Sequence, residues 1–438
     1  MKITVTIAAV GWLASGCASS SDGNVTATGG RVGSGGNGSA QGGATGGSTA
    51  TGGAAPGTGG TVGAGGTNGT GGGGAGAGAG GHAGAAGGAG GTPPGAGGGG
   101  PAGAGGGAGA GGGAPGAGGA SAAAGPCDIY AAANTPCVGA HSTVRALYQA
   151  YAGNLYQVRR ASDKTTKDIP VLAPGGVAAS AQQDAFCMGT TCTISIIYDQ
   201  SPQGNHLPVS PPVHWLPNGG KEADAGAAKI MLGGHAVYGV LFPADSTFTY
   251  RNNKTKGVAT GDQPESMYMV ADGKRYNSRC CFDYGNVETT GNDDGNGTME
   301  TLNWSNITEW SQGAGSGPWV MADLENGVFA GGGAKSVPTN TALVVKYVTL
   351  VLKGPSGNHW SLKDGDAQSG ALAVKYDGAR PAGYSPMKKE GALELGVGGD
   401  GSGGGTGIFF EGAVTAGNPP DAADDAVQAN VVAAGYGR

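Results

Sequence analysis

The chain has 438 residues, 97 of them glycine, and a formal net charge of -6 at pH 7. This acidic balance argues against a nucleic-acid partner. The sequence also lacks basic stripes that interleave with aromatic residues, which counterion release and base stacking would require. Since the glycines crowd into the N-terminal part, composition predicts a folding part of roughly 310 residues, long enough for one domain with a sizeable core.

Residues 1–17 resemble a bacterial lipoprotein signal. Lys2 precedes an apolar run from Ile3 to Leu13, and small residues then lead to Cys17. We interpret this as a signal peptide with a lipobox, in which Cys17 becomes the lipidated first residue and the apolar run is removed. The protein would then be exported and touch a membrane only through this lipid. An ordinary secretory signal, which would give a secreted extracellular protein, is the alternative.

Residues 18–124 are rich in Gly, Ala, Ser and Thr. No Asp, Glu, Lys or Arg lies between Arg31 and Cys127, and no aromatic residue lies between Trp12 and Tyr130. Such a segment cannot bury enough apolar surface to offset its backbone entropy, so we predict a disordered linker. It would tether a folded domain of residues 125–438 while letting it reach over about 50 to 60 Å.

Six cysteines remain once Cys17 is set aside, and an even number in an exported chain predicts a disulfide framework. Spacing alone leaves fifteen connectivities open. Local pairing is the simplest choice, because each bridge would close a short loop and contribute about 2 to 3 kcal/mol. The two local pairs are Cys127 with Cys137 and Cys187 with Cys192.

The last two cysteines, Cys280 and Cys281, are adjacent in the sequence. They could bridge only through a distorted peptide bond, because neighbouring Cα atoms lie closer than in ordinary disulfides. Two free or separately paired thiols are equally compatible with the spacing. The sequence has no CxxC pair and no HExxH motif, and its histidines are scattered, so no metal site is predicted.

Short apolar runs alternate with Gly, Asn and Asp turns throughout residues 125–438. Many short strands separated by turn signals predict an all-β sandwich, whose concave face would suit a sugar chain. Two helices are expected, from Ser142 to about Tyr151 and from Asp421 to Ala434. The apolar runs are Cys192–Tyr198, Ala236–Phe242, Ser266–Ala271, Trp319–Asp323, Tyr347–Leu352, Ala371–Tyr376 and Ile408–Val414.

Six segments, in chain order, carry a recognisable pattern that joins the adjacent cysteines to two carboxylate motifs. They are Gly125–Tyr130, Ile197–Ser201 with Gly204–Leu207, Tyr250–Asn253, Cys280–Asn286, Gly317–Trp319 with Asp323–Asn326, and Gly396–Asp400. On these segments residues 125–438 resemble the fungal and bacterial arabinofuranosidases of glycoside hydrolase family 54.

The resemblance implies a β-sandwich of the concanavalin or jelly-roll type and an exo-acting, retaining α-L-arabinofuranosidase. Such an enzyme removes terminal non-reducing arabinofuranosyl residues from arabinan- and arabinoxylan-type plant polysaccharides by double displacement. Carried over by motif, Glu325 would be the nucleophile and Asp400 the general acid/base. No cofactor is implied, and we expect a monomer. Fungal members continue into a C-terminal arabinose-binding domain, whereas this sequence stops at Arg438, so weaker polymer binding is expected.

The resemblance also implies that Cys280 and Cys281 form an adjacent disulfide that packs against the sugar, and that the other four cysteines pair locally. Asp323, Asn326 and Trp310 match positions that bind arabinose. Gly399 is added as a substrate-binding residue, because glycine lets the backbone approach a ligand closely.

Retaining hydrolysis needs two carboxyl groups about 5 to 5.5 Å apart in different protonation states. We expect Asp323 and Glu325 to alternate on one strand and point to the same face. The Asn326 amide should hold Glu325 ionised. The glycines around Asp400 should leave its carboxyl little polar company and so favour its protonated form.

Each candidate also has a plainer interpretation. An Asp in a Gly-rich run is usually a turn residue, and Glu325 could be a solvent-facing strand residue. Glu411 is a rival carboxylate that we interpret as structural, and Trp310 and Trp319 are each as compatible with the core as with a sugar platform. Asp293–Gly297 resembles a cation-binding turn, although a solvated loop is the favoured interpretation.

Two other functions compete with hydrolysis. One is a non-catalytic, carbohydrate-binding surface lipoprotein on the same sandwich. The other is an adhesin or envelope spacer in which the linker is the functional element. The presence of both Glu325 and Asp400 favours the enzyme.

Overall fold

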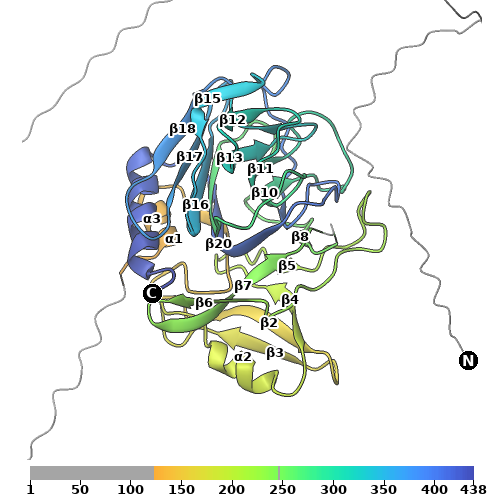
Figure 1. The fold of residues 1–438 in the computed structure, drawn as a ribbon, viewed down its shortest axis with the longest axis vertical. Helices are drawn as coiled ribbons and strands as arrows, with labels where there is room; N and C mark the ends of the chain where they lie inside the picture. Colours follow the sequence, from red (N-terminus) through yellow and green to blue (C-terminus); the bar gives the residue numbers. More distant parts are fainter. Residues whose placement is uncertain (1–122, 245–246) are drawn as a thin grey trace, which may run out of the picture. The chain divides into compact units, whose positions relative to one another are not determined.

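The computed structural model describes residues 123–244 and 247–438. The predicted signal, the lipidation at Cys17 and the linker 18–124 lie outside the described residues. Strands dominate the described part, which confirms the all-β prediction (Figure 1). Its helices are α1 (Pro126–Ala132), α2 (Ser180–Phe186) and α3 (Asp421–Ala434), and none of them is long and apolar enough to cross a membrane.

The helix expected to start at Ser142 is absent from the structure, so that prediction was wrong. Ser142 ends strand β1 (Cys137–Ser142), and its Oγ accepts the backbone N–H groups of Val144 and Arg145 at 3.1 Å. The Leu147 N–H donates to the Gln200 side chain at 2.7 Å. Ser142 therefore caps these N–H groups as it would at the start of a helix, but the Leu147 N–H is taken by a partner outside the segment, and no helix follows. The helix predicted over Asp421–Ala434 is confirmed.

Eight strands form the larger antiparallel sheet, in the order β18-β17-β16-β9-β20-β7-β6, with β1 also paired to β20. The central strand β9 has seven of its eight residues buried, because both of its faces are covered. The other strands are β6 (Ala228–Leu232), β7 (His235–Phe242), β9 (Glu265–Asp272), β16 (Tyr347–Gly354), β17 (Trp360–Asp366), β18 (Ala373–Gly378) and β20 (Gly407–Ala416).

The second sheet has six strands in the order β14-β13-β11-β10-β19-β8 and packs face to face on the first. Tyr284 of β10 lies against Phe409 of β20, with ring centroids 5.2 Å apart. On the outer face of the larger sheet, Tyr436 beyond α3 packs on Tyr347 and Phe410. The strands are β8 (Tyr250–Asn252), β10 (Asp283–Val287), β11 (Glu300–Ser305), β13 (Trp319–Asp323), β14 (Val328–Phe329) and β19 (Ala392–Leu395).

Two smaller sheets complete the described fold. One has the order β3-β2-β4-β5 and the other pairs β12 with β15 in parallel. Their strands are β2 (Asn154–Arg160), β3 (Thr166–Pro170), β4 (Cys192–Ile197), β5 (Leu207–Pro208), β12 (Gln312–Ala314) and β15 (Ser336–Thr341).

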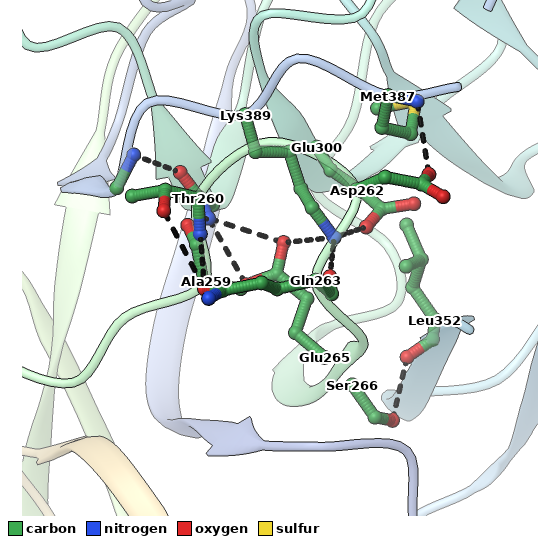
Figure 2. Close-up of polar contacts among 12 residues, drawn as sticks. Ala259, Thr260, Asp262, Gln263, Glu265, Ser266, Glu300, Leu352, Met387 and Lys389 are labelled. Carbon is green, nitrogen blue, oxygen red and sulfur yellow. Dashed lines mark hydrogen bonds and ion pairs between the residues drawn. The ribbon is translucent and has the colours of Figure 1, made fainter. Parts of the chain in front are cut away.

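A buried ionic network joins β9, β11 and the loop before β19 (Figure 2). Lys389 Nζ lies 3.0 Å from Glu300 Oε2 and 3.3 Å from Glu265 Oε1, and all three side chains are at least 98% buried. Burial raises the pKa of Glu265 to about 7. Burial acts in the same direction on Glu300, but Arg380 and Lys389 outweigh it and bring its pKa to about 2. The protonation state of each carboxyl in the network therefore depends on the charges of its neighbours.

The six cysteines of the described part form three disulfides: Cys127–Cys137, Cys187–Cys192 and Cys280–Cys281. The Cα atoms of the first two pairs lie 5.6 and 5.8 Å apart, within the usual range. In the third pair they are 3.0 Å apart, and the peptide bond between the two cysteines is cis. The first two are the local pairs that the spacing favoured, and the third is the bridge that the resemblance implied.

Candidate active site

A cavity of about 370 Å³ lies beside the β13–β14 end of the six-stranded sheet. Its volume is in the range of small-molecule sites. Six of the residues singled out from the sequence line it: Cys280, Trp310, Asp323, Glu325, Asn326 and Asp400. Cys281 and Gly399, also expected at the site, are buried behind it. The other lining residues are His214, Trp215, Asn292, Asp293, Glu309, Gly327, Val328 and Ser402.

Glu325 lies in the turn between β13 and β14, and not on a strand as expected. Strand β13 ends at Asp323, and Glu325 and Asn326 have φ values of 63° and 59°. The Leu324 N–H donates to the Gly327 carbonyl at 3.1 Å, which closes a two-residue hairpin turn with both central residues left-handed. The alternation argument was therefore wrong. Asp323 and Glu325 nevertheless line the same cavity, and the Glu325 N–H donates to Asp323 Oδ1 at 3.2 Å.

Asp323 lies against the adjacent disulfide. Its Oδ2 atom is 3.0 Å from Cys281 Sγ and 3.5 Å from Cys280 Sγ. Burial raises the pKa of Asp323 well above its usual value, and the neighbouring carboxyls of Asp283 and Glu288 raise it further. Trp310 is half-buried and also contributes to the cavity wall. This wall thus combines apolar sulfur and indole surface with a carboxyl that favours its protonated form.

Asp400 reaches the cavity from the turn before β20, and it has more polar company than expected. Its Oδ1 accepts the Ser402 backbone N–H at 2.7 Å, and its Oδ2 accepts the indole N–H of Trp215 at 2.9 Å. The expectation that glycines leave this carboxyl without partners was therefore wrong. The glycines let the turn fold tightly instead, and the partners come from Ser402 within the turn and from a distant segment.

A buried arginine holds the chain segments behind the cavity. The guanidinium of Arg251, fully buried, donates to the Glu394 carboxylate and to the backbone carbonyls of Gly399 and Glu288. Gly399 packs directly against the Glu288 side chain, and a Cβ atom at this position would lie 1.8 Å from Glu288 Oε2. Gly399 is thus needed for a close approach within the protein, and Glu288 lies buried beneath the cavity floor.

Carboxyl groups lie in and beneath this floor, and burial, followed by their mutual repulsion, favours their protonated forms. Burial raises the pKa of Glu325 to about 12, with further contributions from Glu288, Asp323 and Asp400. Burial also raises the pKa of Glu288 to about 7. The side-chain amide of Asn326, expected to stabilise the Glu325 carboxylate, donates instead to Asp293 Oδ1 at 3.0 Å. The group therefore retains protons that separate carboxyls would release at neutral pH.

The model of the family described as "Alpha-L-arabinofuranosidase B, catalytic" matches residues 126–437. The chain belongs to this family. Over about 320 residues it is 52% identical to the probable α-L-arabinofuranosidase B of Aspergillus flavus and 51% identical to the α-L-arabinofuranosidase of Hypocrea jecorina. These alignments cover 71% of the chain and 62% and 63% of the relatives, so the chain spans less than two thirds of their length.

Solved structures of glycoside hydrolase family 54 agree with this membership and confirm the resemblance inferred from the motifs. An α-L-arabinofuranosidase soaked with a cyclic sulfate inhibitor has 48% identity and a TM-score of 0.69, covering 71% of this chain and 66% of its own. An arabinofuranosidase complexed with arabinofuranosyl-α-1,2-xylobiose has 47% identity and the same TM-score, covering 71% and 65%.

Motif reading missed the side chains that reach this family member's cavity from other loops, above all His214 and Trp215. No sequence signal marks them, because they lie in an irregular segment far from both acid motifs. Asp293 had a signal, the Asp-Asp-Gly-Asn-Gly turn, which we interpreted as a solvated loop. The structure places Asp293 in the cavity wall, next to Asn326.

Two side chains whose roles the sequence left open, Glu411 and Trp319, are buried away from the cavity. Glu411 is buried and accepts two hydrogen bonds from the Arg145 guanidinium at 2.5 and 2.6 Å, as its structural interpretation predicted. Trp319 is 1% exposed and donates its indole N–H to the Ala314 carbonyl at 2.9 Å. Of the two tryptophans considered as sugar platforms, only Trp310 borders the cavity.

Proposed function

We propose that the described domain is an exo-acting, retaining α-L-arabinofuranosidase, with Glu325 as nucleophile and Asp400 as general acid/base. The observation that carries this proposal is that two carboxyl groups from separate turns line one sugar-sized cavity, beside the Cys280–Cys281 bridge. Membership of the arabinofuranosidase B family supports it, as does the related arabinofuranosidase that is complexed with arabinofuranosyl-α-1,2-xylobiose.

In the proposed reaction the Glu325 carboxylate attacks the anomeric carbon of a terminal arabinofuranosyl residue. Asp400 gives its proton to the glycosidic oxygen as the bond to the leaving group breaks. The ionised Asp400 then removes a proton from water, which attacks the same carbon and releases both arabinose and Glu325. Two inversions give net retention, and no other co-reactant is required.

The carboxyl cluster explains how charge can be distributed over these roles. Asp323 and Glu288 both have raised pKa values, so they can hold protons at neutral pH. When they are neutral they stop repelling Glu325 and leave the negative charge of the floor to the nucleophile. Asp323, Asn326, Trp310 and the sulfur surface then have the polar and apolar groups needed to bind the sugar.

We assign arabinan- and arabinoxylan-type plant polysaccharides as substrates, because the related enzyme is complexed with an arabinofuranosyl group on xylobiose. The proposal includes a monomeric enzyme exported through residues 1–17, with a lipid on Cys17 or secretion as its two forms. Gly399 acts here by positioning the Asp400 turn.

The decisive experiment measures arabinose release from 4-nitrophenyl α-L-arabinofuranoside and from arabinofuranosyl-xylobiose by the full chain. Glu325→Gln and Asp400→Ala should each lower turnover by about 10³-fold or more, because each removes a group that acts in the transition state. Azide should restore part of the Asp400→Ala rate and give an arabinosyl azide of retained configuration by NMR.

Binding of arabinose polymers without release of sugar would contradict the proposal and favour the carbohydrate-binding alternative. An inverted first product from the unmodified protein would refute the double displacement. Near-full activity of either variant would refute the assignment of that residue.

A further inference from the structure

The loop of residues 213–216 makes two hydrogen bonds to Asp400. The indole N–H of Trp215 donates to Asp400 Oδ2 at 2.9 Å, and the backbone N–H of Trp215 donates to the Asp400 carbonyl at 3.0 Å. Trp215 also lines the cavity, yet 58% of its surface is exposed. It is therefore fixed to the expected acid/base on one side and open to solvent on the other.

Packing around this contact shows that it is built into the fold. Gly401 has a φ of 85°, and a Cβ atom there would lie 2.6 Å from the Val213 side chain. Val213, Leu216 and Val397 form a small buried cluster beneath the loop. The Asp400 turn and the Trp215 loop can therefore approach only because position 401 lacks a side chain.

We infer that Trp215 is a positioning and specificity-determining residue on the leaving-group side of the reaction: its N–H orients the Asp400 carboxyl, and its exposed indole contacts the departing sugar. This inference rests on the proposed function. An acid must approach the glycosidic oxygen to about 3 Å, so that oxygen would lie within about 6 Å of the indole nitrogen. The leaving-group sugar is bonded to this oxygen, so its ring would contact the exposed face of the indole.

The hydrogen bonds to Asp400 also fix its orientation. Ser402 and Trp215 each donate to a different carboxylate oxygen, so the two donors together hold the plane of the carboxyl group in the cavity. The charged or titratable groups around Asp400 are Glu325 and Asp323 across the cavity and His214 on the Trp215 loop, while Arg251 donates to the adjacent Gly399 carbonyl.

The test compares Trp215→Phe, which keeps an aromatic face without the N–H, with Trp215→Ala, which removes both. Kinetics would use arabinofuranosyl-xylobiose, whose leaving group needs a proton, and 4-nitrophenyl α-L-arabinofuranoside, whose leaving group needs little help. The inhibition constant of free arabinose reports on the arabinose side alone. Leu172→Ala removes a side chain of similar exposure (54%) outside the cavity lining and serves as control.

We expect Trp215→Phe to lower kcat/KM on arabinofuranosyl-xylobiose by about tenfold, the effect of one lost hydrogen bond to a charged group. The rate on the nitrophenyl substrate should be affected less, because its leaving group needs little help from the acid. Trp215→Ala should raise KM for the oligosaccharide further. Arabinose should inhibit both variants as it does the unmodified protein.

Equal losses on both substrates or a weaker arabinose inhibition would each overturn the inference, because they would indicate a merely structural role. Unchanged kinetics in both variants would overturn it as well. These results are distinct from failure of the proposed function, which would appear as no arabinose release by the unmodified protein. Thermal unfolding of each variant checks that the fold is intact.

Discussion

Replacing Glu325 by glutamine should make the folded domain less sensitive to rising pH. The carboxyl group has a pKa raised to about 12, against an ordinary value of 4.5, because of its burial and the surrounding carboxyls. The cluster that Glu325 shares with Glu288 and Asp323 therefore binds, in the folded state, a proton that the unfolded chain releases above pH 4.5. Stability is unaffected by this group below pH 4.5 and falls as the pH rises toward the folded-state pKa.

The expected magnitude follows from one retained proton. Each retained proton lowers the free energy of unfolding by about 1.4 kcal/mol per pH unit, which is about 3 kcal/mol between pH 5 and pH 7. Whichever of Glu325, Glu288 and Asp323 carries the charge, removal of one carboxyl removes one retained proton from the group. Glu325→Gln should therefore gain up to about 3 kcal/mol over the unmodified protein across this interval.

Urea unfolding of both proteins at pH 5, 6 and 7 measures this difference. Asp425→Asn, which replaces an exposed acid on α3, is the matched control and should parallel the unmodified protein. Parallel stability curves for Glu325→Gln and the unmodified protein would refute the argument that the cavity floor retains protons.

Three further predictions concern stability. Glu325→Gly should be more stable than Glu325→Gln by about 1 kcal/mol in thermal unfolding, because glycine adopts the observed φ of 63° without strain; equal midpoints would contradict this. Lys389→Met should lose about 3 to 5 kcal/mol in urea unfolding, since it leaves two buried carboxyls short of a cation, whereas the exposed neighbour Lys388→Met should change little; similar losses in both would refute it. Replacing Cys187 and Cys192 by serine should cost about 2 kcal/mol in the same assay, the closure entropy of a short loop, and no loss would argue against that account.

Much of the fold could be predicted from local pattern. The apolar runs of the sequence fall on strands β4, β7, β9, β13, β16, β18 and β20. Most of these strands are buried against neighbouring elements, and such burial selects short apolar segments whatever their partners. The Ser142 helix was mispredicted because groups distant in the sequence take some of its backbone donors: the Gly176 carbonyl accepts the Ala146 N–H, and the Gln200 side chain accepts the Leu147 N–H. Helix propensity is a property of the local sequence and carries no information on such partners.

The sequence predicted which residues form the candidate site better than it predicted the backbone and contacts that hold them. The motifs identified residues of the cavity wall, including Asp323 and Glu325. The side-chain alternation expected of a strand did not reveal that Glu325 occupies a left-handed turn. The partner of Asp400 was missed because Trp215 is 185 positions away in the sequence. Contacts of that kind depend on how sheets and loops meet, which no local pattern encodes.

Arg251 has a consequence for how this protein could be altered. One guanidinium anchors three backbone or side-chain acceptors on separate segments, so a change at the rear of the cavity would propagate to the acid turn and to two neighbouring strands together. The rim offers more latitude at Asn292, which is exposed on a loop that these contacts do not involve. Substitutions intended to change the proposed linkage preference should therefore begin at the rim of the cavity and leave the segments held by Arg251 unchanged.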